Sequence, residues 1–409
     1  MNIYDNYSET YALFKSLATE NHYNSLAKNI SSAYCTEQTQ KTIKRITKKN
    51  IKYAHMGQLV IHDGICYASF IQNPGDDGEE HDSDTSGVVL AVFTLESVMS
   101  DSFEPEKDVE YYPIGEKGGS CAGYTADSIF KDNSMCLIGD KLYVCFCFIS
   151  PDNRTRLFRK IFLIKEKIWT DELLLTLHFN GNDYEFNDET LNLILSEHGC
   201  KKTKSGIIEL VSAWNEYKGE YYGSGIMCGG EPNNGFIVKT KDFKTMELVA
   251  VPPFNNDGMA EISSYIFKNK LFVACRQHYA IPYLYLGVMD LETKKWLTYY
   301  KIPDGNVRPW FFEYKNELYL LHTIEEMSRR YTNISKIRVT DIGWDRHDDI
   351  TPIEIMATLK NCGFYYATAE YNGEIYYVAT RDTESFGKLA LNFFDEETVN
   401  KKLLEIFIG

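Results

Sequence analysis

An acid and a guanidinium stand at the two ends of one predicted hairpin. Glu261 precedes the apolar run ISSYIF, Arg276 follows the run LFVAC, and Lys268-Asn269-Lys270 separates the two runs. Because a hairpin brings its ends together, we expect the two side chains to lie side by side. A carboxylate can accept a proton from a nearby hydroxyl, and a guanidinium can bind an anion through two parallel hydrogen bonds. The pair therefore indicates a polar site at the open end of this hairpin.

The same hairpin pattern recurs six times along the chain. Each copy has an apolar run, a turn residue, a spacer, an apolar residue and an aromatic residue that starts a second run. The turn residues are Gly64, Asp140, Gly219, Asn269, Asn316 and Gly373. Gly, Asn and Asp tolerate the positive φ of tight hairpin turns, so their recurrence predicts six strand pairs.

A third strand that ends in a polar turn follows most of these hairpins. The clearest examples are TKDFKTMEL (240–248) and MDLETKKW (289–296), with counterparts in IKEKIW (164–169), TDIGW (340–344) and FDEETVNKKL (394–403). Four-stranded units that recur about every 50 residues are typical of a β-propeller. Two stacked β-sandwiches with similar hairpins are the alternative.

The predicted fold is all-β, a six-bladed β-propeller over residues 52–409 with a short N-terminal helical segment over residues 1–51. The segment YSETYALFKSLATENHYNSLAKNI has apolar residues near helical spacing and is expected to form one or two helices packed on the propeller. Either part of this segment or the C-terminal LLEIFI is expected to complete a blade and close the ring.

Composition narrows the classes of function. The formal net charge of -15 argues against nucleic acid as a partner, because nucleic-acid binding needs clustered Lys and Arg. No signal-peptide pattern and no long apolar run is present, so we expect a cytoplasmic protein without a membrane segment. The ten cysteines show no zinc-like spacing and are expected to be buried, reduced thiols. We expect no metal and no cofactor, and the sequence does not specify an oligomeric state.

The hairpin turns serve as a ruler for the residues that face the central channel of a propeller. Eight residues before the turn stand Glu261, Arg308 and Tyr365, nine before it stands His55, and Asp127 occupies a similar place in the second repeat. Seven residues after the turn stand Arg276 and Thr323, with His322 and Arg381 one step away. Polar groups from at least five repeats are thus expected at the same end of the central channel, where a pocket is expected.

This set of residue types suits one kind of chemistry. Arg276 and Arg308 can make bidentate bonds to a carboxylate or phosphate. A tyrosine beside a glutamate can act as a nucleophile, since the carboxylate accepts the phenolic proton. Tyrosine nucleophiles are an exception among glycosidases and suit an anomeric carbon whose attached carboxylate repels an anionic attacker.

The constellation resembles the sialidases, which are six-bladed propellers with an arginine triad, a Tyr/Glu nucleophile pair and an aspartate acid/base. The resemblance covers roughly residues 50–395. It implies Glu261 as the base, Tyr365 as the nucleophile with Tyr366 as its neighbour, and Arg276 and Arg308 as two arginines of the triad. The turns TKDFKTMEL and MDLETKKW are similar to the family's aspartate boxes but lack the usual glycine.

Two parts of the family pattern fall on blade one. The acid/base aspartate is expected in the loop NPGDDGEEHDSDTSG (73–87), whose candidates are Asp76, Asp77, Glu79, Glu80, Asp82 and Asp84, with Asp82 placed in the predicted catalytic set. The first triad arginine is missing, because the chain has His55 in AHMGQLVIHDG at that place. Arg381 or Arg329 could substitute for it.

The sequence thus predicts a retaining exo-glycosidase, sialidase-like, that acts on a terminal acidic sugar. A furanosidase-like glycosidase with carboxylate catalysis by Asp127 and Glu261 is a second possibility, although His55 stands where its blade-one aspartate base is expected. A noncatalytic propeller that binds carbohydrate or protein is the third, because fold does not fix function.

Overall fold

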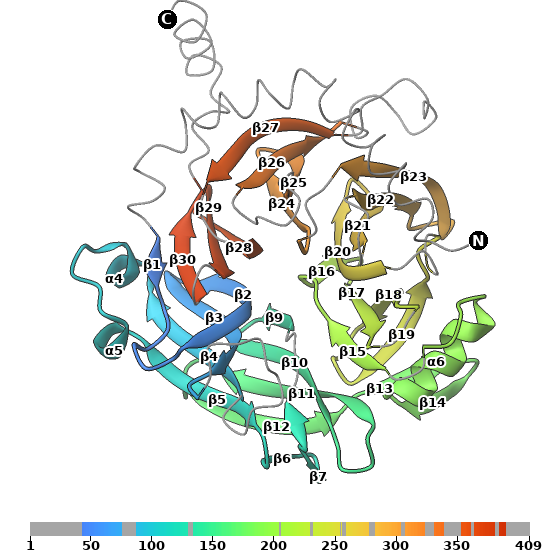
Figure 1. Cartoon of the computed structure of the whole chain (residues 1–409), viewed down its shortest axis with the longest axis horizontal. Coiled ribbons are helices and arrows are strands. Elements are labelled where there is room, and N and C mark those ends of the chain that lie inside the picture. The colour runs from blue at the N-terminus through green and yellow to red at the C-terminus, as the bar shows by residue number, and fades with distance from the viewer. Residues whose placement is uncertain are drawn as a thin grey trace, which may run out of the picture.

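Six β-sheets of four or more strands, which we call blades, surround a common centre (Figure 1). The computed structural model describes residues 43–75, 87–129, 134–203, 206–229, 232–253, 255, 259–277, 283–303, 307–323, 331–338, 353–360, 364–380 and 384–389. The protein is mostly β, and its sheets have the propeller-like arrangement that the recurring hairpins predict rather than that of two stacked sandwiches.

Blades one and two come first in the chain. Blade one consists of β2 (Tyr53–His62), β3 (Ile65–Asn73), β4 (Gly87–Thr94) and β5 (Glu110–Glu116), with α4 (Leu95–Met99) and α5 (Pro105–Asp108) between the last two strands. Blade two consists of a divided inner strand, β8 (Ser128–Ile129) and β9 (Ser134–Ile138), followed by β10 (Lys141–Ile149), β11 (Thr155–Leu163) and β12 (Ile168–Leu174). A small hairpin, β6 (Ser120–Cys121) and β7 (Tyr124–Thr125), precedes blade two.

Blade three is the largest sheet. Its inner strand is also divided, into β15 (Ile207–Leu210) and β16 (Asn215–Tyr217), and β17 (Glu220–Cys228), β18 (Asn234–Thr240) and β19 (Thr245–Ala250) follow. A hairpin of β13 (Thr176–Phe179) and β14 (Asn182–Glu185) extends it, with β13 parallel to β19. The helix α6 (Asp188–Glu197) is capped at its N-terminus by Asn187, whose side chain accepts a hydrogen bond from the backbone N–H of Thr190.

Blades four, five and six complete the ring. Blade four is β20 (Met259–Phe267), β21 (Lys270–Gln277), β22 (Tyr283–Asp290) and β23 (Lys295–Pro303). Blade five is β24 (Trp310–Tyr314), β25 (Glu317–Thr323), β26 (Tyr331–Ile337) and β27 (Ile353–Lys360). Blade six is β28 (Phe364–Tyr371), β29 (Glu374–Thr380), β30 (Glu384–Lys388) and β1 (Lys44–Arg45).

The sixth blade takes its outer strand from the other end of the chain. β1 pairs antiparallel with β30, with Lys44 opposite Phe386 and Arg45 opposite Ser385. A piece of the N-terminal segment, one of the two options that the sequence leaves open, thus completes a blade. The helices expected within residues 1–42 lie outside the described residues, and the division at residue 51 stays a prediction.

The hairpin turns have the backbone that their residue types predict. Five of the six turns have two successive residues with positive φ: Asp63-Gly64, Lys218-Gly219, Lys268-Asn269, Lys315-Asn316 and Asn372-Gly373. This is the type I′ geometry, whose twist matches that of paired strands. At the second hairpin the positive φ falls on Gly139 (61°), one residue before the turn residue Asp140 that the sequence pattern marked.

Two of the predicted polar turns are held by an aspartate. Asp242 Oδ1 accepts hydrogen bonds from the backbone N–H groups of Lys244 (2.8 Å) and Thr245 (3.0 Å). Asp290 Oδ1 accepts from the N–H groups of Glu292 (3.0 Å) and Thr293 (2.8 Å). A short acidic side chain that satisfies nearby backbone donors fixes such a turn without the help of a glycine.

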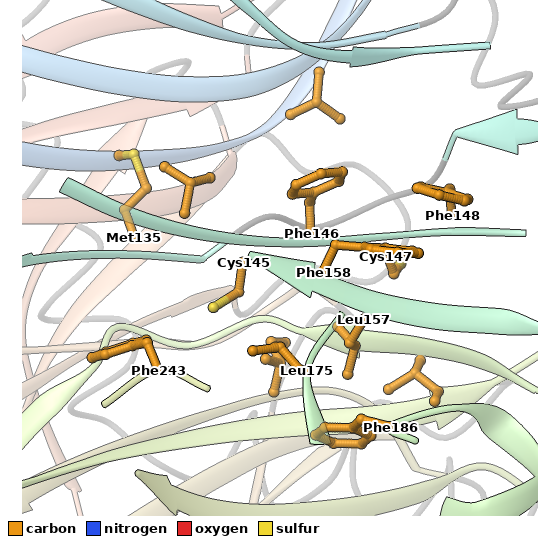
Figure 2. Close-up of a cluster of buried hydrophobic side chains, with 14 of the residues drawn as sticks. Met135, Cys145, Phe146, Cys147, Phe148, Leu157, Phe158, Leu175, Phe186 and Phe243 are labelled. Atoms are coloured by element: carbon orange, nitrogen blue, oxygen red, sulfur yellow. The ribbon is translucent and has the colours of Figure 1, made fainter. Parts of the chain in front are cut away.

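The core between blades one, two and three is rich in phenylalanine (Figure 2). Phe158 stacks on Phe148 with ring centroids 4.1 Å apart, and both are buried. Phe243 enters the same cluster directly after Asp242. The cysteines follow the expectation of reduced residues, since the eight within the described residues are in the thiol form and seven of them are buried. No helix in the described part of the chain is both long and apolar enough to cross a membrane.

Candidate functional site

The predicted nucleophile, base and arginine meet through short polar contacts. Tyr365 Oη donates a hydrogen bond to Glu261 Oε1 over 2.6 Å and accepts one from Arg276 Nη1, also over 2.6 Å. The same Nη1 atom forms an ion pair with Glu261 Oε2. Blades four and six thus supply one three-membered polar cluster, which we call the Tyr365 triad.

Each residue of the Tyr365 triad lies at the same end of an inner strand pair. Glu261 is near the start of β20, Arg276 is near the end of β21, and Tyr365 is the second residue of β28. The pairing register shifts between Met259 and Ile262 in β20 and between Phe364 and Ala367 in β28. Such β-bulges redirect side chains and are common beside active sites.

The backbone of Tyr365 adopts an unusual conformation. Its φ is +57°, in the left-handed region that a bulky aromatic residue rarely occupies. A residue held there costs on the order of 1–3 kcal/mol, and such residues cluster at functional sites. The surrounding fold therefore stabilises an unfavourable backbone conformation at this residue.

The Tyr365 triad is buried as well as charged. The exposed fractions are 2% for Tyr365, 8% for Glu261 and 7% for Arg276. A phenol between a carboxylate and a guanidinium can lose its proton to the carboxylate while the guanidinium stabilises the phenolate oxygen. Charge–charge interactions are stronger away from water, so this arrangement favours an activated tyrosine.

His55 and Arg308 lie against the Tyr365 ring. The His55 and Tyr365 ring centroids are 4.3 Å apart in an edge-to-face arrangement, and His55 Nδ1 is 2.7 Å from Thr380 Oγ1. The Arg308 guanidinium carbon is 5.6 Å from the centroid of the Tyr365 ring. Two more predicted site residues, from blades one and five, therefore contact the nucleophile candidate.

Other predicted residues have different surroundings. His322 Nε2 is 2.8 Å from Ser335 Oγ, within blade five. The Tyr366 ring packs against Tyr377, with centroids 5.2 Å apart. Asp127 is exposed, and its backbone N–H donates to Ile149 O over 2.9 Å. Predicted residues that lie outside the described part of the chain are Asp76, Asp77, Glu79, Glu80, Asp82, Asp84, Arg329 and Arg381.

Two further buried polar residues were not predicted from the sequence. Thr380, the partner of His55, stands seven residues after Gly373, so the ruler that marked Arg276 and Thr323 could have found it. Glu209 of β15 is a buried carboxylate that accepts a hydrogen bond from Cys228 Sγ over 3.4 Å. It stands ten residues before Gly219, off the ruler, and no motif marks it.

Two surface pockets lie elsewhere in the described part of the chain. One, of about 510 Å³, is lined by His198, Asn255, Lys294 and Trp296 among others. The other, of about 200 Å³, is lined by Ile114, Phe146, Phe148 and Lys160 among others. Neither includes a residue of the Tyr365 triad. In the described residues, no group of three or more His, Cys, Asp or Glu side chains could hold a metal ion.

Known structures share this fold although no family model and no curated protein matches the chain. Trypanosoma rangeli sialidase in complex with the inhibitor DANA matches with a TM-score of 0.57 and 11% identity, over 89% of this chain and 61% of that chain. Phage phi92 endosialidase matches with a TM-score of 0.54 and 12% identity, over 82% of this chain and 63% of that chain. A Dyadobacter fermentans protein of unknown function matches with a TM-score of 0.56 and 12% identity, over 85% of this chain and 98% of that chain.

These likenesses define the class of fold. The chain spans about three fifths of the length of the sialidases that it matches. At 10–12% identity the likeness concerns the fold alone, which is that of a sialidase-like β-propeller.

Proposed function

We propose that the protein is a retaining glycoside hydrolase that removes a terminal acidic sugar, with Tyr365 as its nucleophile. The observation that carries the proposal is the pair of hydrogen bonds at Tyr365 Oη, which donates to Glu261 Oε1 and accepts from Arg276 Nη1. A buried tyrosine that has both a proton acceptor and a cation at its oxygen is equipped for nucleophilic attack.

In the first step, Tyr365 Oη forms a bond to the anomeric carbon and the glycosidic C–O bond breaks. The phenolic proton passes to Glu261, and the electron pair of the broken bond goes to the leaving oxygen, which takes a proton from a general acid. The proposed acid is Asp82 or another acid of the blade-one loop, outside the described residues. Arg276 stabilises the charge on the tyrosine oxygen as the proton leaves.

In the second step, water attacks the same carbon and releases the sugar with retained configuration. The general acid now accepts a proton from the water, and Glu261 returns its proton to Tyr365 as the Tyr–sugar bond breaks. Neither step needs a metal ion or a redox group. The two displacements on opposite faces account for retention.

The proposed substrate is anionic because the groups around Tyr365 include two arginines and a histidine. Arg276, Arg308 and His55 all contact Tyr365, and Glu261 is the acid that faces it among the described contacts. A carboxylate on the anomeric carbon would be attracted to the net positive charge of these groups and would repel a carboxylate nucleophile. A tyrosine, neutral before attack, suits that substrate better. The T. rangeli sialidase that shares the fold binds sialic acid, which supports a carbohydrate ligand.

The test is hydrolysis of an aryl sialoside by the purified full chain. Tyr365→Phe and Glu261→Gln are expected to lower kcat by at least a thousandfold, or about 4 kcal/mol, with circular dichroism unchanged. Tyr67→Phe, the same change at a buried tyrosine of β3, is the control and should keep its rate. Treatment with 2,3-difluorosialic acid, the reagent in a covalent complex of T. rangeli sialidase, should label the peptide that contains Tyr365. The proposal is contradicted if the wild type hydrolyses no aryl glycoside.

A noncatalytic sugar-binding propeller is the second candidate function. The observation in its favour is that Tyr365, Glu261 and Arg276 bond to one another and are almost fully buried. Calorimetry with a sialoside then shows binding without turnover, and Tyr365→Phe leaves the Kd unchanged. Catalysis by Asp127 and Glu261 gains no such support, because Asp127 is exposed and Glu261 bonds to Tyr365.

A further inference from the structure

Blades one and six begin with the same backbone irregularity. The register shifts between His55 and Gln58 in β2, where two residues of β2, Met56 and Gly57, oppose one residue of β3. It shifts in the same way between Phe364 and Ala367 in β28. His55 stands nine residues before its turn glycine, and Phe364 stands nine residues before its own. The two bulges are therefore equivalent positions in two neighbouring blades.

The equivalence extends to the backbone dihedrals. Met56 and Tyr365, the first of the two unpaired residues in each bulge, have φ values of +61° and +57°. Both side chains are buried and belong to the same apolar cluster. Neither is a residue type that enters the left-handed region easily, so both need support from the surrounding fold.

Arg308 reaches the next carbonyl of both bulges. Its Nη2 atom lies 3.4 Å from Gly57 O and 3.5 Å from Tyr366 O, which are the residues directly after Met56 and Tyr365. The side chain is 1% exposed, and it comes from the segment that leads into β24 of blade five. One guanidinium from a third blade therefore links the two bulges.

We infer that Arg308 is a positioning residue, which holds the left-handed backbone of Tyr365 by bridging the carbonyls of Gly57 and Tyr366. The inference rests on the proposed function where it treats Tyr365 as the nucleophile. It goes beyond that function because it gives Arg308 a task that needs no substrate.

The bridge has a physical reason. A bulge removes carbonyls from the strand ladder, and a buried carbonyl without a donor is costly. A guanidinium has five N–H donors in a rigid planar fork, so it can serve carbonyls of two blades and still face the tyrosine ring. Lysine offers one flexible ammonium and cannot reproduce that geometry.

This assignment differs from the carboxylate clamp that the sequence predicts for Arg308. A clamp acts only when substrate is bound, so its loss raises KM. A positioning residue acts on the nucleophile before and during the reaction, so its loss lowers kcat. The two roles therefore separate in the kinetics of one variant.

The experiment compares Arg308→Lys and Arg308→Gln with the wild type on an aryl sialoside. We expect kcat to fall by about tenfold to a hundredfold in both variants, with KM changed less than about threefold. Arg156→Lys, a change at another buried arginine in blade two, is the control and should keep kcat. A tenfold rise in KM with unchanged kcat overturns the inference in favour of a clamp.

A second measurement needs no turnover. Fluorotyrosine placed at position 365 reports its surroundings through its ¹⁹F resonance, and we expect Arg308→Lys to shift or broaden that resonance in the ligand-free protein. Arg156→Lys should leave it unchanged. If the wild type is inactive and Arg308→Lys still shifts the resonance, the result supports the inference and contradicts the proposed function. An unmoved resonance, or failure of both Arg308 variants to fold while Arg156→Lys folds, overturns it.

Discussion

The apolar cluster of blades one to three and the polar centre between blades four and six both consist of buried side chains, yet the chemical groups that they bury differ. The cluster around Phe146, Phe148 and Phe158 consists mainly of buried apolar side chains (Figure 2). The centre buries a carboxylate, a guanidinium and a phenol that bond to one another.

The two regions contribute to stability in opposite ways. Burial of apolar area stabilises a fold by about 25 cal/mol per Å². A buried ion pair loses its hydration, and its mutual attraction often does no more than offset that loss. A fold that needed only stability would gain more from apolar residues at positions 261, 276 and 365. The polar centre therefore points to function, whereas the phenylalanine cluster supplies stability.

The largest expected effect is in the cluster. Phe158→Ala removes a fully buried ring that stacks on Phe148, so we expect the free energy of unfolding to fall by about 3–5 kcal/mol. Urea denaturation followed by circular dichroism measures it. Phe158→Leu keeps most of the volume and should lose much less. Equal losses in the two variants would show that volume is not what this position supplies.

A smaller effect is expected in the polar centre, and it should be non-additive. Arg276→Gln leaves the Glu261 carboxylate buried without its ion pair, so we expect a loss of about 3 kcal/mol. Glu261→Gln combined with Arg276→Gln removes both charges and should cost less than the sum of the single changes. A double-mutant cycle in urea measures the coupling. Additive losses would mean that the two charges do not interact. The polar centre would then not differ from the apolar cluster in how its residues contribute to stability.

A third prediction concerns the turn that places Phe243 in the cluster. Partial burial acts to raise the pKa of Asp242, but hydrogen bonds from the backbone N–H groups of Thr245 and Lys244 outweigh it and hold the pKa below its usual value. We expect Asp242→Ala to cost about 1 kcal/mol near pH 7, a figure discounted for solvent screening because Asp242 is exposed. Urea denaturation measures the difference.

The pH dependence of that difference has a definite sign. The stabilisation by Asp242 is fully present above the unfolded pKa of about 3.9 and is lost as the pH falls through the lower folded value. The difference in the free energy of unfolding between the wild type and Asp242→Ala should therefore become smaller toward pH 3. A difference that grows below pH 4 would contradict this assignment.

The smallest effect is chemical rather than energetic. Burial raises the pKa of Cys136 and of Cys145 to about 12, so both thiols stay protonated at pH 8. Iodoacetamide should leave these residues unmodified in the folded protein and label them after denaturation in urea. Peptide mass spectrometry measures the labelling. Rapid labelling of Cys145 at pH 8 would show that the cluster opens to solvent.

Much of the fold was predictable because tight turns require particular residue types, which can be recognised in the sequence. Residues such as Gly64, Asn269 and Gly373 recur where positive φ is required, and the structure has positive φ at each of them. The strand that completes blade six was not predictable, since the two-residue β1 carries no periodic pattern. The hairpin of β13 and β14 also escaped, because it repeats nothing else in the chain.

The candidate site was predictable in part, for a geometric reason. Tyr365, Glu261 and Arg276 keep phase with the turns, and strand pairing converts equal spacing along the chain into a shared end of the blades. The contacts of Arg308 with Gly57 and Tyr366 could not be foreseen, because bulges and left-handed residues leave no mark in residue type at Met56 or Tyr365. Asp82 and Arg381 stay predictions.

The pairing of β1 with β30 has a consequence for how the chain folds. During synthesis Lys44–Arg45 leaves the ribosome more than 300 residues before its partner strand, which includes Phe386. Blades one to five can therefore collapse before the ring closes, and the closing contact has very long sequence separation, which slows folding. A nascent chain stalled before residue 384 lacks β30 and so carries an open sheet edge on blade six, which is able to pair with another chain.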